Sequence, residues 1–376
     1  MYVLGRDGGT GAVVELGSYR AADGSDGTAV GLDLDRPHAA LVVGKRGYGK
    51  SYTLGVLAED AARAPGIAPV VVDPMGGFGG LAAGDAVPAR VVNAPTVPAG
   101  TLPPAAWPTL FGLQSTDPVG ALLWEAARDA ETLDAMAAHV AAADVDDGVR
   151  RAARNHLRLA DSWGVFDADG IDATALLSGE VTVLDGSALD DRAASVLVHA
   201  VATGLYTACV ERRPDRLPWI LLDEAHVFFD GVAAPALETV LTRGRTPGVS
   251  LVAATQRPSA LPSVAVSQAD VLLAHRLTAT SDVDALSAAV PTYLSGTLRE
   301  RLPTEPGEAL IVDDITESVH GVRVRHRETP HGGDDPRASD RAEGCDQSGS
   351  PRLVPQSGHS PSTTGTGVAQ SGQNSR

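Results

Sequence analysis

The chain has 376 residues, 47 of them acidic and 30 basic, so that its formal net charge is −17. An acidic surface argues against a protein coated with DNA-binding side chains, although it leaves room for a local basic channel. The two cysteines, Cys209 and Cys345, are too few for a disulfide framework and favour a reducing compartment. A composition rich in Asp and poor in Lys fits either a saline cell interior or a GC-rich genome.

No targeting segment is expected. The N-terminal sequence MYVLGRDGGT lacks a basic stretch followed by an apolar one, so we expect no signal peptide. No uninterrupted apolar run approaches ~18 residues, and we therefore expect no membrane-spanning helix and no membrane partner. Together these features predict a soluble, cytoplasmic protein.

The composition changes along the chain and predicts three parts. Residues 1–37 are rich in Gly and Asp with short apolar runs, and we expect a small N-terminal β cap there. Residues 38–326 carry the patterns of a folded domain. Residues 327–376 contain few large apolar side chains, so we expect a disordered C-terminal tail.

Between residues 38 and 326, short apolar runs alternate with helical patterns. This alternation is typical of an α/β fold in which helices cover both faces of a mostly parallel sheet. Strands are expected at 39–44, 68–73, 180–185, 218–224, 249–256 and 270–276, helices at 50–64, 189–213 and 234–243, and a closing hairpin at 307–314 and 319–327. Residues 94–108 are Pro-rich and predict a loop, and Ala-rich helical patterns predict a helical insertion at about 115–165.

The run GKRGYGKS, residues 44–51, contains the only two lysines of the chain, Lys45 and Lys50. It matches the pattern G-x-x-x-x-G-K-[ST] and lies between an expected strand and an expected helix, which is the context that a P-loop requires. Backbone N–H groups of such a loop surround a β-phosphate, and the second lysine contacts the β- and γ-phosphates. A bulkier, planar guanidinium would not replace that ammonium.

The P-loop predicts a set of ATP-binding and Mg²⁺-binding residues. The hydroxyl of Ser51 is expected to bind Mg²⁺, while Lys45 either touches the γ-phosphate or is an exposed loop cation. The expected ATP-binding residues are Gly44, Lys45, Arg46, Gly47, Tyr48, Gly49, Lys50, Ser51 and Tyr52.

Two further strand ends carry the groups that ATP hydrolysis needs. In WILLDEAH, residues 219–226, Asp223 is expected to hold Mg²⁺ and Glu224 to act on the attacking water. One strand later, Gln256 ends VSLVAATQ and is expected to hydrogen-bond the γ-phosphate or its water. The tetrad DEAH also occurs in helicases with two RecA-like domains, but only about 100 residues able to fold follow it here, so we reject that assignment.

The order of these motifs resembles the HerA/FtsK superfamily of P-loop ATPases, particularly its archaeal HerA-like branch. The matching segments include VVGKRGYGKSYTLGVLAED, VVVDPMG, ILLDEAHVF, GRTPGVSLVAATQRPSALPSVAVSQAD and HRLTATSDVDAL, and they lie between about residues 38 and 313. The resemblance implies a RecA-like core and a ring-forming, usually hexameric, motor on double-stranded DNA that works beside a nuclease in break repair. It also makes Lys50 and Ser51 nucleotide and Mg²⁺ ligands, Asp223 the Walker B aspartate, Glu224 the catalytic glutamate and Gln256 the sensor.

Ring ATPases of this kind complete each site with an arginine from the neighbouring subunit. Arg245 and Arg276 are our candidates for that role, with Arg243 and Arg257 behind them. Where members of the family typically have an acidic residue after the aspartate of the second strand, this sequence has Gly77.

A basic helix is the candidate DNA contact. Arg150, Arg151, Arg154 and Arg158 lie within two turns of an expected helix, where Arg154 and Arg158 share a face at i, i+4 and Arg151 lies one turn earlier. They could line a DNA channel, or they could belong to a solvated helix that pairs with nearby Asp side chains.

Three functions follow from these observations. The first is an ATP-hydrolysing DNA translocase or helicase-like motor of the HerA type. The second is an assembly or regulatory ATPase that uses nucleotide to change partners and does not move DNA. The third is an ATPase of conjugation or type IV secretion, which shares the same core chemistry.

Overall fold

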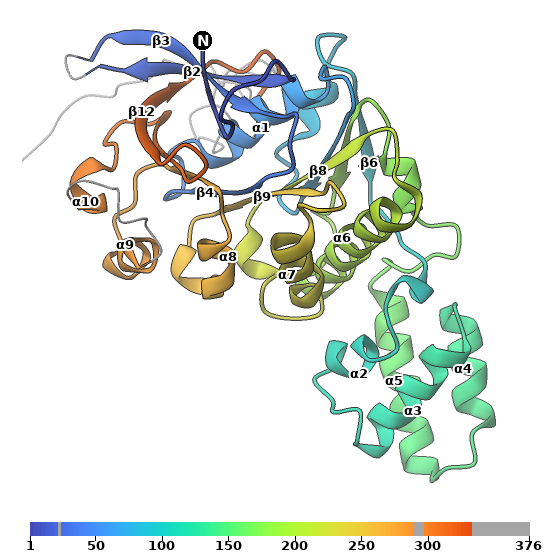
Figure 1. Ribbon diagram of the computed structural model, residues 1–376. Helices are drawn as coiled ribbons and strands as arrows, with labels where there is room; N and C mark the ends of the chain where they lie inside the picture. Colours follow the sequence, from blue (N-terminus) through green and yellow to red (C-terminus); the bar gives the residue numbers. More distant parts are fainter. Residues whose placement is uncertain (22–23, 289–296, 333–376) are drawn as a thin grey trace, which may run out of the picture. The chain divides into compact units, whose positions relative to one another are not determined.

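The structure is a computed structural model that describes residues 1–21, 24–288 and 297–332, which lie within one compact unit, Met1–Gly333. The described strands form one twelve-stranded sheet in the order β1-β3-β2-β12-β11-β10-β4-β9-β8-β5-β7-β6 (Figure 1). They are β1 (Tyr2–Leu4), β2 (Val13–Arg20), β3 (Asp26–Asp33), β4 (Ala39–Val43), β5 (Ile67–Asp73), β6 (Ala89–Asn93), β7 (Val181–Asp185), β8 (Leu217–Leu222), β9 (Ser250–Thr255), β10 (Val271–Ala274), β11 (Glu308–Asp313) and β12 (Ser318–Val324).

The strands from β10 to β6 run parallel, and β11, β12, β2 and β3 continue the sheet antiparallel. The mostly parallel α/β fold that the sequence predicts is thus confirmed. The carboxyl ends of β4, β9, β8 and β5 lie at one edge, which is where ligands bind in open sheets of this kind.

Helices cover the two faces of the sheet. The helix α1 (Lys50–Ala61) lies on one face, and α6 (Asp191–Arg212), α7 (Ala234–Arg243) and the short α8 (Ser263–Ser267) lie on the other (Figure 1). Neighbouring strand residues belong to two different apolar clusters: Val71 packs with the side chains of α1, and Val72 packs with those of α6 and α7. Since successive side chains of a strand point to opposite faces, continuous apolar runs build both layers.

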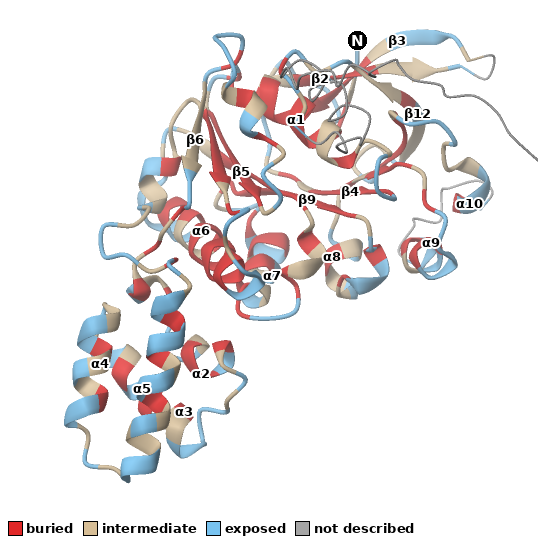
Figure 2. Ribbon diagram, turned by 180° about the vertical axis from the view of Figure 1, so that it is seen from behind, coloured by how far each residue is buried: buried red, intermediate tan, exposed pale blue. Residues whose placement is uncertain are grey.

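The buried helix α6 is the only described helix that is long and apolar enough to cross a membrane. An 18-residue window of it is 72% buried inside the protein, and Figure 2 shows the buried residues along its length. Such burial is typical of a core helix in a sheet layer.

The N-terminal strands β1, β2 and β3 lie where the sequence predicts a β cap. They join the main sheet directly, because β2 pairs with β12 through Tyr19 and Val322. Leu16 and Val30 are fully buried in the same apolar cluster as α1. The cap therefore extends the main sheet and shares its core.

The helical insertion consists of α2 (Ala106–Leu110), α3 (Pro118–Asp129), α4 (Leu133–Ala142) and α5 (Asp147–Ser162), so its helices begin before residue 115. These helices pack on one another into a small bundle (Figure 1). The two connecting segments meet at Val97, whose N–H donates to the carbonyl of Val165 at 2.8 Å and whose carbonyl accepts from Asp167 at 3.0 Å. The insertion therefore leaves and re-enters the sheet at one place.

Several elements were not predicted from the sequence. They are the edge strand β6, the short helices α8, α9 (Thr280–Ser287) and α10 (Leu298–Arg301), and the 3-10 turns η1 (Gly79–Ala82), η2 (Ala99–Thr101), η3 (Ala173–Leu176), η4 (Ala225–Val227) and η5 (Pro258–Ala260). These are short, and each is fixed by packing rather than by a periodic pattern.

Residues 325–332, which we call the C-terminal strap, pack against α1. The strap includes residues 327–332, which we expected to be in the disordered tail. Glu59 of α1 is fully buried, and one of its oxygens accepts from the N–H groups of Glu328 and Thr329 and from the Thr329 hydroxyl, at 2.7–3.0 Å. The rest of the expected tail, residues 333–376, lies outside the described residues.

Candidate nucleotide site

The P-loop joins β4 to α1 at the carboxyl edge of the sheet. Its first residue, Gly44, is so close to β10 that a Cβ there would lie 2.6 Å from the Cβ of His275. Gly49, the N-cap of α1, has φ 114°, a conformation that other residues rarely adopt. Because the cap has no side-chain hydrogen bond and the first turn has no acidic residue, the amide N–H groups of that turn are available to an anion.

The two lysines of the loop lie in different environments. Lys50 is buried, with 6% of its surface exposed, and its Nζ lies 3.5 Å from the carbonyl oxygen of Lys45. Burial lowers the pKa of Lys50, and the charges of Glu224 and Asp223 oppose that shift. Lys45 is exposed, with its Nζ 5.0 Å from the centre of the Tyr48 ring. The buried lysine is therefore the one that needs an anionic partner.

The hydroxyl of Ser51 donates a hydrogen bond of 2.6 Å to Oδ2 of Asp223. Asp223 follows β8 directly, is 4% exposed, and accepts the N–H of Glu224 with its other oxygen at 2.8 Å. Hydroxyl and carboxylate oxygens are the ligands that Mg²⁺ prefers. The two expected metal ligands, 172 residues apart in sequence, thus lie together.

The strand that carries Asp223 is not the direct neighbour of the P-loop strand. The strand β9 lies between β4 and β8, pairing with both. Gln256 follows β9, so the residue expected to sense the γ-phosphate comes from the strand between the P-loop and the acidic pair. This arrangement could not be predicted from the sequence, because spacing along the chain does not reveal the order of strands in a sheet.

Glu224 has a backbone conformation that is uncommon for a residue with a side chain. Its φ is 47° and its ψ 38°, in the left-handed region. Non-glycine residues in that region cluster at functional sites, where the surrounding structure holds the strain. Burial and the nearby charge of Asp223 raise the pKa of Glu224, while Lys50, Arg46 and a hydrogen bond with the Gln256 side chain lower it.

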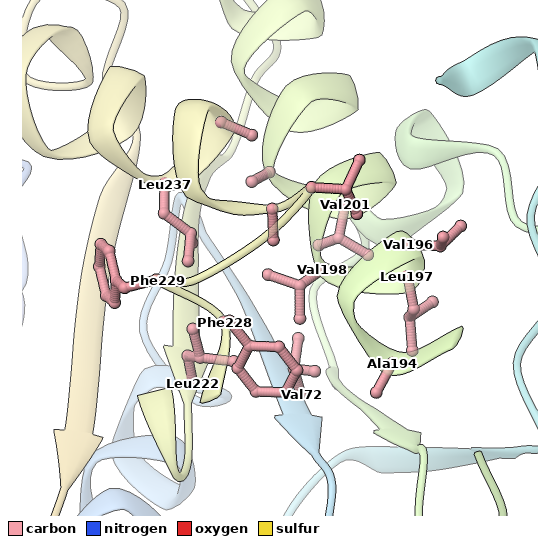
Figure 3. Close-up of a cluster of buried hydrophobic side chains, with 14 of the residues drawn as sticks. Val72, Ala194, Val196, Leu197, Val198, Val201, Leu222, Phe228, Phe229 and Leu237 are labelled. Atoms are coloured by element: carbon pink, nitrogen blue, oxygen red, sulfur yellow. The ribbon is translucent and has the colours of Figure 1, made fainter. Parts of the chain in front are cut away.

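The turn after Glu224 is anchored in the core. Ala225 and Phe228 are almost completely buried. Figure 3 shows Phe228 in the apolar cluster that also contains Val72, Leu222 and side chains of α6. Burial of the Phe228 ring therefore fixes the position of the polar side chains that precede it in the turn.

The remaining P-loop side chains point in several directions. Tyr48 lies near Arg276, whose guanidinium carbon is 5.8 Å from the ring centre and whose Nη1 donates to the carbonyl of Thr304 at 3.0 Å. The hydroxyl of Tyr52 accepts from the N–H of Arg327 at 2.6 Å, so this side chain contacts the C-terminal strap. Arg46 and Gly47 are exposed on the loop.

The candidate arginines fall into two groups. Arg276 follows β10, and its carbonyl accepts from the N–H of Lys45 at 2.8 Å, so it lies beside the P-loop of its own chain. Arg243 and Arg245 are exposed at the end of α7, before β9 begins, and hence at the opposite edge of the sheet. Arg257 is exposed just after Gln256. Arg245 therefore lies away from its own P-loop.

Arg151, Arg154 and Arg158 are exposed on α5. Within the described ranges, none of the three has a side-chain hydrogen bond or ion pair, whereas Arg150 pairs with Asp147 at 2.6 Å. Of the arginines at the start of α5, only Arg150 thus pairs with a nearby Asp side chain. The structure does not bring these arginines to the P-loop, since they belong to the inserted bundle.

Some polar contacts around the site were not predicted from the sequence. Asp73 is 1% exposed and accepts the N–H groups of Met75, Gly77 and Phe78, which shapes the turn where the family has an acidic residue. His226 and Thr255 share a hydrogen bond between Glu224 and β9. The histidine in WILLDEAH was the sequence feature that could have pointed to this contact. However, no pattern in the sequence shows which strand lies beside it.

The chain was compared with known families, curated proteins and solved structures. Residues 14–117 match the family described as "Helicase HerA, central domain". The search of curated proteins finds no match.

Several similar solved structures have TM-scores above 0.5. One is VirB4 of Thermoanaerobacter pseudethanolicus, with a TM-score of 0.61 and 17% identity over 86% of this chain and 98% of that one. Another is the bacterial conjugative coupling protein TrwB, with a TM-score of 0.57 and 16% identity over 81% of this chain and 88% of that one. TrwB in complex with the GTP analogue GDPNP matches with a TM-score of 0.53, 18% identity and coverage of 77% and 87%. These comparisons confirm the resemblance to the HerA family over residues 14–117, and they show that most of the chain shares its fold with VirB4 and TrwB.

Proposed function

We propose that this protein is a cytoplasmic ATP-hydrolysing motor of the HerA type that acts on double-stranded DNA. The observation that carries the hydrolytic part is the contact between Ser51 and Asp223, next to Glu224. It joins the P-loop, a pair of Mg²⁺ ligands and a buried carboxylate in one site.

Magnesium and ATP fit the residues that are present. The hydroxyl oxygen of Ser51 would bind Mg²⁺ directly, and Asp223 would hold the ion through water. The amides of the P-loop and the Lys50 ammonium would bind the phosphates. When bound, Mg²⁺ neutralises charge on the phosphate oxygens.

Glu224 is the proposed general base. It accepts a proton from a water molecule while the water oxygen forms a bond to the γ-phosphorus, and the bond from phosphorus to the bridging oxygen breaks toward ADP. A raised pKa suits a base, because a more basic carboxylate accepts the proton more readily. Gln256, through its hydrogen bond with Glu224, would sense whether the γ-phosphate is in place.

The DNA part of the proposal is supported by the exposed face of α5. Arg151, Arg154 and Arg158 are exposed within two turns of one helix and have no ion pair among the described residues, so they form a local basic face in a protein with a net charge of −17. Each could neutralise one phosphate, which would make binding depend steeply on salt.

An assembly of several copies belongs to the same proposal. Arg245, exposed and far from its own P-loop, is the candidate to stabilise transition-state charge in a neighbouring subunit, and we assign Arg276 to its own subunit's loop instead. A hexamer and a nuclease partner are what the HerA resemblance implies, and co-purification with an added nuclease would test the latter.

The experiment that tests this function is steady-state ATP turnover with and without linear duplex DNA, over a wide range of KCl. A triple variant with Arg151, Arg154 and Arg158 changed to Ala is the matched comparison. We expect DNA to stimulate the wild type and not the variant, with the basal rate unchanged. If turnover requires Glu224 but DNA does not change it at any salt concentration, the protein is an ATPase and the hypothesis of a DNA motor is wrong.

A second candidate is an ATPase of conjugation or type IV secretion. It is favoured by the fold shared with VirB4 and TrwB over most of the chain. An assembly ATPase that moves no DNA is the third, favoured by the strongly acidic composition. Nucleotide-dependent change in oligomer size without DNA stimulation would select the third.

A further inference from the structure

The carboxylate of Glu224 has a neighbour that can hold it. Its Oε2 is buried and has no regular hydrogen bond in the described residues, but Nδ1 of His226 lies 3.4 Å away. Only 14% of the His226 side chain and 22% of the Glu224 side chain is exposed. A buried carboxylate oxygen in this position needs a donor, and the histidine is the group placed to supply it.

The same nitrogen of His226 also contacts β9. Nδ1 lies 3.2 Å from Oγ1 of Thr255, and that oxygen accepts the N–H of Arg257 at 3.0 Å. One ring nitrogen therefore stands between the last residue of β9 and the carboxylate that follows β8. Because β9 also pairs with the P-loop strand β4, the contact links all three strands of the site.

The chemistry of the two acceptors selects a tautomer. A carboxylate oxygen repels a nitrogen lone pair, so Nδ1 must carry the proton if it is to stabilise Glu224. Burial and the charges of Arg257 and Lys50 lower the pKa of His226, which favours a neutral ring. A neutral ring with its proton on Nδ1 can donate to Thr255 and presents the same N–H to the Glu224 oxygen 3.4 Å away.

The turn holds the histidine rigidly enough for this purpose. His226 lies in η4, between the buried residues Ala225 and Phe228, and Phe228 is part of the apolar cluster under β8 (Figure 3). Glu224 itself is held in the left-handed region by the same turn. Few conformations other than the observed one are therefore open to the pair.

We propose that His226 is a positioning residue for Glu224, with its Nδ1–H holding one carboxylate oxygen and Thr255 holding the ring. The proposal rests on the proposed function only in that Glu224 is the base for ATP hydrolysis. One oxygen of Glu224 is then oriented by His226, which leaves lone pairs of the other to accept the proton of the water. A displacement at the end of β9 would be transmitted to the base through Thr255.

Three substitutions of His226 test this assignment by turnover. Asn places its amide nitrogen where Nδ1 lies, whereas Gln places it where Nε2 lies, and Ala removes the donor. We expect H226A and H226Q to lower kcat about 10- to 100-fold, less than the roughly 10²- to 10⁴-fold contribution of a general base, because Glu224 itself remains. H226N should stay within about 3-fold of wild type. The dissociation constant of a non-hydrolysable ATP analogue should change less than about 3-fold in each.

Controls separate positioning from folding. Thr255→Ser should keep kcat, and Thr255→Val should lower it, since only serine retains the hydroxyl. His139→Ala, on α4 and outside the site, should leave kcat and the melting temperature unchanged. Equal kcat in H226N and H226Q, or a loss of analogue binding that matches the loss of kcat, would overturn the proposal.

A second measurement does not depend on turnover. The ¹⁵N shifts of the His226 ring, assigned with H226N, report which nitrogen carries the proton. We expect Nδ1–H in the wild type and a shift change in Thr255→Val. An Nε2–H tautomer would refute the positioning role even if ATP is hydrolysed. If the proton is on Nδ1 but the protein has no ATPase activity, the proposed function is wrong, whereas the contact between His226 and Glu224 stands.

Discussion

Ser51 and Asp223 form a hydrogen bond of 2.6 Å across a strand that belongs to neither of them. Ser51 is the second residue of α1, the helix that follows β4. Asp223 follows β8, and β9 lies between those two strands. The contact therefore spans two strand spacings, and a side chain of the helix is needed to make it. Any ion that binds both residues will draw α1 and the end of β8 onto one centre.

Lys50 and Lys45 should respond differently to the same conservative change. Lys50→Arg is expected to lower ATP turnover about 100-fold or more, because a guanidinium does not fit a buried site shaped for a compact ammonium. Lys45→Arg keeps the charge near the Tyr48 ring and should cost less than about 3-fold. Steady-state kinetics on both variants measures the contrast. Similar losses in the two would mean that Lys45 contacts phosphate as closely as Lys50.

Each exposed arginine of α5 should contribute one phosphate contact. Changing Arg151, Arg154 or Arg158 to Ala is expected to reduce the slope of log affinity against log salt by about 1 for duplex DNA. Arg128 of α3 pairs with Asp129 at 2.7 Å, so Arg128→Ala should leave the slope unchanged. Fluorescence anisotropy at several KCl concentrations gives these slopes. Equal effects at all four positions would point to a general charge effect.

Arg245 and Arg276 should be separable by mixing subunits. If Arg245 acts on a neighbour, Arg245→Ala subunits mixed with Lys50→Ala subunits will recover part of the turnover, because some sites then combine an intact P-loop with an intact arginine. Arg276→Ala should not be rescued in this way, since Arg276 lies beside its own loop. A mixture of Arg245→Ala and Lys50→Ala subunits that stays as inactive as either parent would remove Arg245 from this role.

The C-terminal strap should stabilise the P-loop helix. Thr329→Val removes a hydroxyl that donates to the fully buried Glu59 at 2.7 Å, and hydrogen bonds to charged groups are worth roughly 1.5–3 kcal/mol. We expect a loss of that size in urea unfolding. Thr246→Val, on an exposed turn, is the matched control.

A pair of shortened chains extends the same test. A chain ending at residue 326 should melt several degrees below one ending at residue 332, because only the longer chain keeps the donors from Glu328 and Thr329 to Glu59. Coincident melting curves would show that the strap adds nothing to stability.

His38 should make stability fall at alkaline pH. Its side chain is fully buried, with Nδ1 3.2 Å from Asp270 and Nε2 3.8 Å from Asp33. Burial alone would lower the pKa of His38, but the hydrogen bonds and charges of Asp270 and Asp33 outweigh it and raise the pKa to about 9. The folded state therefore binds a proton that the unfolded state, with a pKa near 6.5, has released.

This contribution is complete below pH 6.5 and is lost as pH rises through about 9, a difference of roughly 3 kcal/mol for such a shift. The measurement is urea unfolding between pH 6 and pH 10, with the curve of His38→Gln subtracted from that of the wild type. The difference should decline with pH. A flat difference would place the proton elsewhere in the cluster.

The sequence predicted the parts of the fold that repeat a pattern. Continuous apolar runs identified β4, β5, β8 and β9, because strands buried on both faces have few other solutions. Strand β6 was missed, since its ARVVN is short and only half-buried at the sheet edge. The strap was missed because its stability comes from hydrogen bonds to Glu59, which composition does not reveal.

In the site, too, the parts that are local in sequence were predicted and the long-range contacts were not. Gly44, Lys50 and Ser51 were predicted together because a P-loop is local in sequence. The contact from Thr255 through His226 to Glu224 was not, because it depends on β9 lying beside β8. Arg276 was considered as an arginine for a neighbouring subunit, and only the register of β10 against β4 shows it beside its own P-loop.

The helical insertion has a consequence for protein engineering. Its two ends meet at Val97 and Phe166, which form a parallel bridge, and the buried Trp107 of α2 stacks 5.3 Å from Phe166. A segment whose ends already touch can be exchanged for a short glycine linker at little cost in loop-closure entropy. The α5 arginines would leave with it, so a chimera lacking the bundle would have the P-loop and the acidic pair without that basic face. Grafting a foreign bundle at the same two positions could then give this ATPase core a different polymer to hold.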